Sequence, residues 1–185
     1  MANKLVLVTH GDFADGIISS IELVLGAAVP IASVCVQAHE TVLAVVERTE
    51  AAIAEFGPDE PIVVLTDIIG GSTTQSALRV RARAAGNVYF VVGLNLGLVL
   101  EIALLPLIAR TRASLTGSEF SSDPVSERDT KTASSRMTTV VREKNEAMLR
   151  RAVAAAKEGI GLLRDLMPDD QDLNRRQTDP DTAEL

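Results

Sequence analysis

Short uninterrupted apolar runs alternate with amphipathic segments from Leu5 to Ala109. Such runs are typical of strands that are buried on both faces of a parallel sheet. Segments whose apolar residues recur three and four positions apart predict helices with one face toward the core. The expected strands are Leu5–Val8, Pro30–Val36, Pro61–Thr66 and Asn87–Val92, and the expected helices are Asp15–Leu25, Thr41–Phe56, Ser72–Ala85 and Gly97–Ala109.

Strands that alternate with helices at this spacing indicate an α/β fold. We predict a doubly wound, mainly parallel sheet of four strands, with right-handed crossovers and helices on both faces. Ligands of such sheets bind beyond the carboxyl ends of the strands, where the strand order reverses. The residues that directly follow a strand are therefore the first candidates for function.

The pattern changes in the C-terminal part of the chain. Residues 111–139 are rich in Ser and Thr and have no apolar period, so we expect an exposed insertion or flexible connector there. Residues 140–158 regain a helical pattern, and 159–163 have the composition of a last short strand. We expect one domain over residues 1–167 and a disordered polar tail over 168–185.

Composition narrows the classes of function. The 25 acidic and 18 basic residues give a net charge of −7, which argues against a nucleic-acid binder. One Cys and two His exclude a disulfide and a Cys- or His-cluster metal centre, so we expect no metal and no cofactor. The most apolar stretch, residues 86–109, contains polar residues and a proline. We therefore expect no membrane span and a cytoplasmic location.

Two strand ends carry residues suited to phosphoryl transfer. His10 ends the first strand, and Asp67 follows the third strand, just before a Gly-Gly-Ser turn that opens a helix. Such a turn presents backbone N–H groups and the positive end of the helix dipole to an anion. An imidazole held at one nitrogen by a carboxylate is a directed nucleophile at the other. We predict that His10 is the nucleophile, that Asp67 orients it, and that the phosphoryl oxygens contact Gly71, Ser72, Thr73 and, more weakly, Thr9.

Three segments carry a specific resemblance: Val8–Gly16, Leu65–Ser72 and Val92–Glu101. In this order they resemble the signature segments of the enzyme IIA components of the mannose/fructose/sorbose family of the bacterial sugar phosphotransferase system (PTS). The resemblance extends from Lys4 to Leu163, interrupted by the Ser/Thr-rich stretch. It departs from the family pattern at Thr73 and Gly97, where Pro is usual, and at Gln75, where Asn is usual.

The resemblance implies a phosphotransferase with a phosphohistidine intermediate. HPr would donate the phosphoryl group to His10, and a separate IIB component would accept it for sugar uptake through the membrane components IIC and IID. It also implies a homodimer in which an antiparallel C-terminal strand, here Gly159–Arg164, is exchanged. An alternative within the same fold is a regulatory module whose phosphorylation state controls its docking to a regulator.

Several polar residues have a structural interpretation beside the functional one. Asp67 is an alternative cap for the helix that follows it, and Asp12 and Asp15 are expected to cap the first helix. Asn95 and Glu101 have two alternative roles, lining the crevice or capping the fourth helix, and the sequence favours neither. His39 is expected at the surface and Cys35 in the core. A Ser-His-Asp hydrolase is disfavoured because the G-x-S-x-G turn is absent.

Overall fold

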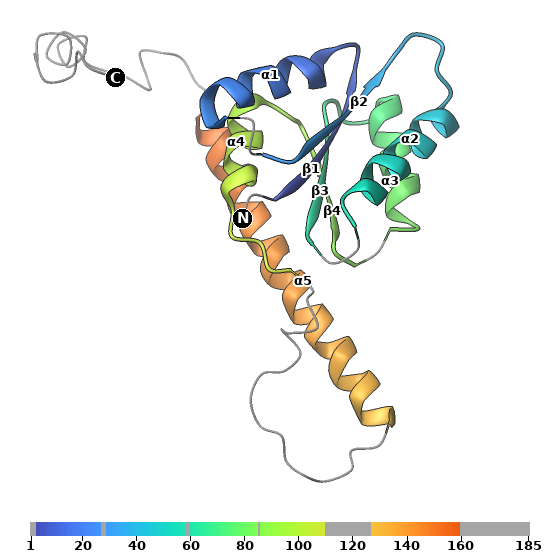
Figure 1. The fold of residues 1–185 in the computed structure, drawn as a ribbon, viewed down its shortest axis with the longest axis vertical. Helices are drawn as coiled ribbons and strands as arrows, with labels where there is room; N and C mark the ends of the chain where they lie inside the picture. The colour runs from blue at the N-terminus through green and yellow to red at the C-terminus, as the bar shows by residue number, and fades with distance from the viewer. Residues whose placement is uncertain (1–2, 27–28, 58–59, 85, 110–126, 160–185) are drawn as a thin grey trace, which may run out of the picture.

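Strands and helices alternate along the chain in the computed structural model, which describes residues 3–26, 29–57, 60–84, 86–109 and 127–159 (Figure 1). Each strand is followed by one helix, and a long helix completes the described part. The elements are β1 (Lys4–His10), α1 (Phe13–Leu25), β2 (Ile31–Val36), α2 (Val42–Glu55), β3 (Ile62–Thr66), α3 (Ser72–Arg81), β4 (Val88–Val92), α4 (Leu96–Leu104) and α5 (Glu127–Glu158).

The four strands form one parallel sheet in the order β2-β1-β3-β4. The α/β fold predicted from the apolar pattern is therefore confirmed. The chain moves outward from β1 to β2 and then returns to place β3 on the other side of β1. This reversal puts the topological switch point between β1 and β3, where open α/β sheets bind their ligands.

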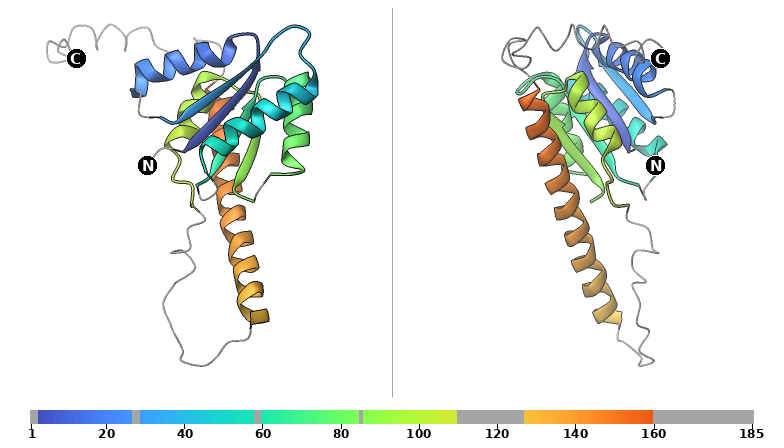
Figure 2. Two further views of the ribbon diagram at one scale, coloured as in Figure 1. Left: turned by 45° about the vertical axis from the view of Figure 1, so that its right-hand side comes forward. Right: turned by 90° about the vertical axis from the view of Figure 1, so that its left-hand side faces the viewer.

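Helices cover both faces of the sheet. Helices α1 and α4 lie over one face, with α5 packed against α4, and helices α2 and α3 lie over the other (Figures 1 and 2). Strand β1 serves both layers because successive side chains point to opposite faces. Leu5 and Leu7 join the core under α1 and α4, whereas Val6 and Val8 join the core under α2.

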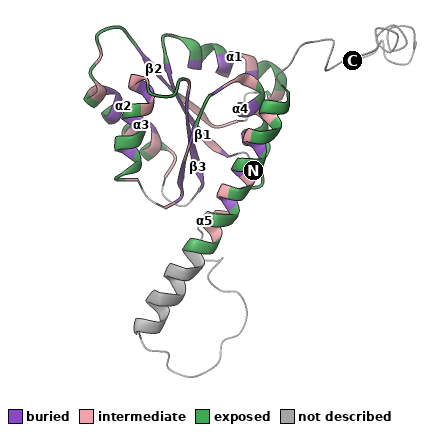
Figure 3. Ribbon diagram, turned by 180° about the vertical axis from the view of Figure 1, so that it is seen from behind, coloured by how far each residue is buried: buried purple, intermediate pink, exposed green. Residues whose placement is uncertain are grey.

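The central strands are buried along their length, and the outer faces of the helices are exposed (Figure 3). All five residues of β3 are buried, which explains why its sequence is an uninterrupted apolar run ending in Thr66. Burial of each Val or Leu side chain contributes about 1.5–3 kcal/mol relative to an exposed position. This rigid centre fixes where the ends of β1 and β3 lie.

Helix α5 corrects one expectation. It begins at Glu127, so residues 127–139, where we expected an exposed insertion or flexible connector, belong to a helix. Figure 1 shows that the first half of this helix extends away from the sheet. A helix that covers no core needs no apolar stripe, so this part of the sequence has no apolar period from which the helix could be predicted.

The second half of α5 is fixed to the domain through Asn145. This fully buried side chain donates to the hydroxyl of Tyr89 and to the carbonyl of Ile108, and it accepts from the Ile108 N–H, at 2.9–3.0 Å. Three satisfied hydrogen bonds offset the cost of burying an amide.

No helix in the described residues is long and apolar enough to cross a membrane. The expected strand Gly159–Arg164, apart from its first residue, and the expected tail at 168–185 lie outside the described residues.

Candidate functional site

His10 and Asp67 meet at the switch point of the sheet. The register of β1 and β3 pairs Val8 with Thr66, so that β1 extends beyond the last paired residue of β3. Asp67 leaves β3 at the height of His10, and its Oδ2 atom lies 2.9 Å from His10 Nδ1. The same Oδ2 atom accepts the backbone N–H of His10 at 2.9 Å. The carboxylate thus fixes both the ring and the backbone of His10.

The environment of Asp67 keeps it ionised. Burial raises the pKa of this carboxyl group, but hydrogen bonds from the backbone and ring of His10, the Thr73 hydroxyl and the Ile68 N–H outweigh burial and lower the pKa below its ordinary value. An ionised carboxylate only accepts hydrogen bonds, so we assign the ring hydrogen of His10 to Nδ1. Nε2 then has the free electron pair.

The second oxygen of Asp67 is held as firmly as the first. Asp67 Oδ1 accepts the Thr73 hydroxyl at 2.9 Å and the Ile68 N–H at 2.8 Å. No side chain caps the first turn of α3, so Asp67 is not the cap of that helix. The carboxylate instead joins the β3–α3 loop to the end of β1.

The Gly-Gly-Ser turn lies against the other side of the imidazole. Ser72 Oγ is 3.0 Å from His10 Nε2, and the hydroxyl donates to the free electron pair assigned there. A Cβ atom at Gly71 would lie 3.0 Å from His10 Cε1, so only glycine lets the turn approach this closely. Gly70 has a φ of +82°, which side chains strongly disfavour. The first N–H groups of α3 have neither a side-chain cap nor a partner within the helix.

Thr9 and Thr73 are buried in the interior beside the site, and their hydroxyl groups bind structural partners. Both side chains are fully buried. Thr9 Oγ1 accepts the Ala14 N–H at 2.8 Å, which is the role at the start of α1 that we expected of Asp12. The Asp12 side chain makes no such cap and instead accepts from Gln37 Nε2 at 3.2 Å.

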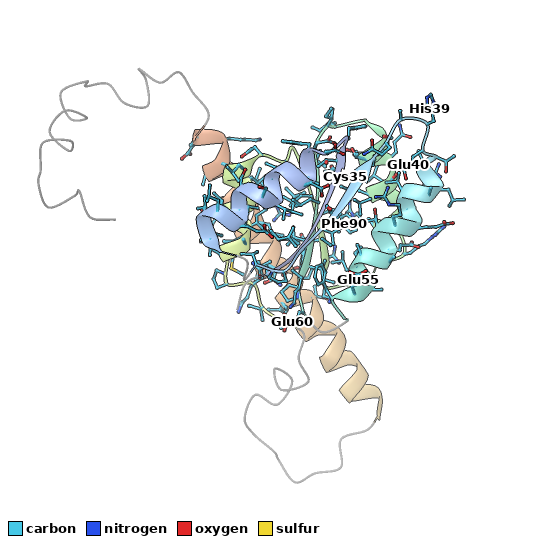
Figure 4. The ribbon with its side chains drawn as sticks, turned by 45° about the horizontal axis from the view of Figure 1, so that its top comes forward. Cys35, His39, Glu40, Glu55, Glu60 and Phe90 are labelled. Atoms are coloured by element: carbon cyan, nitrogen blue, oxygen red, sulfur yellow. The ribbon has the colours of Figure 1, made fainter. Side chains whose placement is uncertain are left out.

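The remaining candidates lie elsewhere or have structural partners. Asn95 accepts the Leu98 N–H at 2.9 Å and therefore caps α4. His39 occupies the outer tip of the β2–α2 loop with a φ of +71° (Figure 4). Cys35 is half-buried on β2, and Glu101 is exposed on α4. None of these four contacts His10 through a hydrogen bond recorded among the described residues.

One cluster brings possible metal ligands together. The side-chain ligand atoms of Asp12, Asp15 and Cys35 lie within 4.8 Å of one another. Burial raises the pKa of the Cys35 thiol, and metals bind the thiolate. We assign no metal or cofactor to these residues.

A histidine at the carboxyl edge of a doubly wound sheet, oriented by one carboxylate and facing the start of a helix, is an arrangement suited to carrying a phosphoryl group. Residues 4–116, more than half of the chain, match the model of the family described as the PTS system fructose IIA component. The chain belongs to this family of enzyme IIA components. No curated protein sequence matches it.

Solved structures have the same fold. The PTS IIA protein associated with the fucose utilization operon from Streptococcus pneumoniae is 19% identical with a TM-score of 0.58, and the match covers 90% of this chain and 99% of that one. The mannose/sorbose specific IIA subunit from Enterococcus faecalis is 22% identical with a TM-score of 0.51, covering 78% and 92%. At these identities the likeness concerns the fold alone.

Proposed function

We propose that this chain is a phosphoryl carrier that accepts a phosphoryl group from phospho-HPr on Nε2 of His10 and passes it to a separate IIB component. The observation that supports this best is the position of His10 between Asp67 on Nδ1 and Ser72 on Nε2. Membership of the IIA family supports a role in the sugar phosphotransferase system. We place the protein in the cytoplasm, where the membrane components IIC and IID would use its product indirectly.

The transfer step balances without a metal or cofactor. The electron pair of Nε2 attacks the phosphorus atom, a P–Nε2 bond forms, and the P–N bond to the donor imidazole breaks. The donor ring carries a proton on its other nitrogen and leaves as neutral imidazole. The ring of His10 then keeps its hydrogen on Nδ1 and becomes cationic, and the ionised Asp67 stabilises this charge at 2.9 Å.

The phosphoryl oxygens need donors that are free when the group arrives. Ser72 lies 3.0 Å from Nε2, and its hydroxyl can turn from the nitrogen to a phosphoryl oxygen. The uncapped N–H groups at the start of α3, which begins directly after Gly71, supply further donors. Thr9 and Thr73 are already committed to Ala14 and Asp67, so we propose only Gly71 and Ser72 as phosphate ligands.

Intact-mass spectrometry tests the carrier function. The protein is incubated with phosphoenolpyruvate, enzyme I and HPr, and the mass is measured at neutral to alkaline pH because phosphohistidine is acid-labile. We expect the gain of one acid-labile phosphate in the wild type and no gain in His10→Ala. His39→Ala is the matched control, since His39 lies at the tip of another loop, and it should be labelled like the wild type. Stoichiometric labelling of His10→Ala would refute the assignment.

Onward transfer separates the carrier from the regulatory alternative. Addition of a IIB component to the labelled protein should remove the phosphate from His10 and place it on IIB. A labelled protein that keeps its phosphate in the presence of IIB components of the family would contradict the carrier function and favour a regulatory module.

We also propose that the protein is a homodimer. Strand β4 is the last strand in the order β2-β1-β3-β4, and the edge of a sheet is where a further strand can add. A cavity of about 420 Å³ runs beside it, lined by β4 and by Arg81, Arg142 and Leu149. We propose that this space receives a strand from a second copy, with residues 159–164 as the donor. Light scattering should give twice the 19.6 kDa of one chain, and truncation after Gly159 should give the monomer mass.

A further inference from the structure

Large apolar side chains are exposed on the two segments that follow His10 and Asp67 in the sequence. Phe13, the first residue of α1, is 45% exposed, and Ile68 and Ile69, directly after Asp67, are 59% and 82% exposed. Single exposed apolar residues are ordinary, but several beside one reactive group mark an interaction site. We expected no role for these residues from the sequence, although two isoleucines between Asp67 and a glycine turn have no obvious use in a core.

The loop that presents the isoleucines is well anchored. The Ile68 N–H donates to Asp67, and the Ile68 carbonyl accepts the hydroxyl of Thr74. The Gln75 side chain donates to the Gly70 carbonyl at 3.4 Å. These hydrogen bonds hold the backbone on both sides of Ile69, so its exposure belongs to an ordered loop. A surface that is ordered before binding loses little conformational entropy when a partner docks.

The charges beside these apolar residues are acidic. Asp12 and Asp15 are exposed at the start of α1, next to Phe13. On the β2–α2 side, the cation of Arg48 is paired with Glu40 at 2.8 Å. An apolar surface with an acidic edge is complementary to a protein surface that is apolar with a basic edge. Cavities of about 420 Å³ lie along β4 and between α2 and α3, and His10 lines neither of them.

We propose that Phe13, Ile68 and Ile69 form the docking surface for the protein that delivers the phosphoryl group, and that Asp12 and Asp15 favour a donor with basic residues around its phosphohistidine. This inference rests on the proposed function, since it names the surface that the donor uses. Docking brings the donor phosphorus to Nε2 of His10, where the P–N bond of the donor is exchanged for the P–Nε2 bond. We call Phe13, Ile68 and Ile69 the docking surface below.

Two phosphoryl donors of different size separate docking from chemistry. Phospho-HPr needs the docking surface, whereas phosphoramidate is a small donor that transfers its phosphoryl group to imidazole and releases ammonia. For Ile69→Ser we expect the ratio of the HPr rate to the phosphoramidate rate to fall about tenfold, as for a residue central to an interface. Leu23→Ser is the matched control because Leu23 is 89% exposed near the far end of α1, and its ratio should equal that of the wild type.

Salt tests the acidic edge of the docking surface. With Asp12→Asn and Asp15→Asn combined, the HPr rate at low ionic strength should fall and become less sensitive to added salt. The same salt series on the Leu23→Ser control should match the wild type. A double variant with the salt sensitivity of the wild type would overturn the role of these two carboxylates.

The failures can be told apart. A wild type that takes no phosphate from phospho-HPr removes the proposed function and the docking surface together. A wild type that is labelled while Ile69→Ser keeps the full ratio overturns the docking surface alone. Slower transfer only to IIB would assign the surface to the acceptor, and a changed molar mass of Ile69→Ser would assign it to contacts between copies. Either result also overturns the proposal.

Discussion

The hydroxyl of Thr73 donates a 2.9 Å hydrogen bond to Asp67 Oδ1, the carboxylate oxygen that does not contact His10. This bond is one of the causes that lower the pKa of Asp67. Pro, which the resemblance gives as usual at this position, has no hydroxyl and could not donate this bond.

Replacement of Thr73 by Val keeps the volume of the side chain and removes the hydroxyl. We expect the pKa of Asp67 to rise, the unfolding free energy to fall by about 1.5–3 kcal/mol, and labelling of His10 to slow. The pKa is measured from the carboxyl chemical shift during titration. Thr73→Ser retains a hydroxyl and should restore the low pKa, and a Val variant that titrates like the wild type would contradict the role given to this bond.

The ionised state of Asp67 makes stability depend on pH in acid. Its folded pKa is lower than the ordinary value of 3.8, so its contribution is complete well above 3.8 and is lost as the pH falls through the folded pKa. We expect the difference in unfolding free energy between the wild type and Asp67→Asn to shrink between about pH 5 and pH 2. Denaturant unfolding at several pH values measures it, and a constant difference over this range would refute the lowered pKa.

Gly71→Ala tests the close approach of the turn to His10. The added Cβ atom would lie 3.0 Å from His10 Cε1, so the ring must move by a few tenths of an ångström. Because reacting groups are sensitive to small displacements, we expect labelling to slow by about tenfold or more. Gly16→Ala is the control: a Cβ atom there meets nothing within 4 Å, and this helical variant should gain about 0.5–1 kcal/mol of stability with unchanged labelling.

Ser72→Ala tests the hydroxyl beside Nε2. In the phosphorylated protein this hydroxyl is proposed to donate to a phosphoryl oxygen, and such a charge-assisted bond contributes about 1.5–3 kcal/mol. Because the same hydroxyl donates to Nε2 in the unphosphorylated protein, only the difference between the two bonds counts, and we expect the equilibrium between phospho-HPr and the variant to shift toward phospho-HPr by about fivefold. Quantifying both phosphorylated proteins at equilibrium measures the shift. Ser20→Ala is a suitable comparison because the Ser20 hydroxyl donates to the Gly16 carbonyl within α1.

Much of the fold was predictable because buried segments are recognisable in the sequence by their apolar residues. Strand β3 lies under helices on both faces, so it reads as a continuous apolar run ending at Thr66. The start of α5 at Glu127 was missed, since a helix that extends beyond the core has no apolar period. The contact of Asn145 with Tyr89 and Ile108 was missed as well, because a buried amide looks like any polar residue until its partners are known.

The sequence by itself determined the strands and helices, and it determined which strand ends carry the candidate functional residues. The strand that ends at His10 and the Asp67-to-Ser72 turn follow from local patterns of apolar residues, glycine and polar groups. The sequence predicted that Asp67 orients His10, but the tertiary structure makes the contact, because the two residues are 57 positions apart and meet through the register of β1 and β3. The same packing buried Thr9 and Thr73 beneath the site and left Ser72 facing Nε2. Local patterns determine which segments form strands, helices and turns, whereas contacts between distant side chains depend on how the strands align.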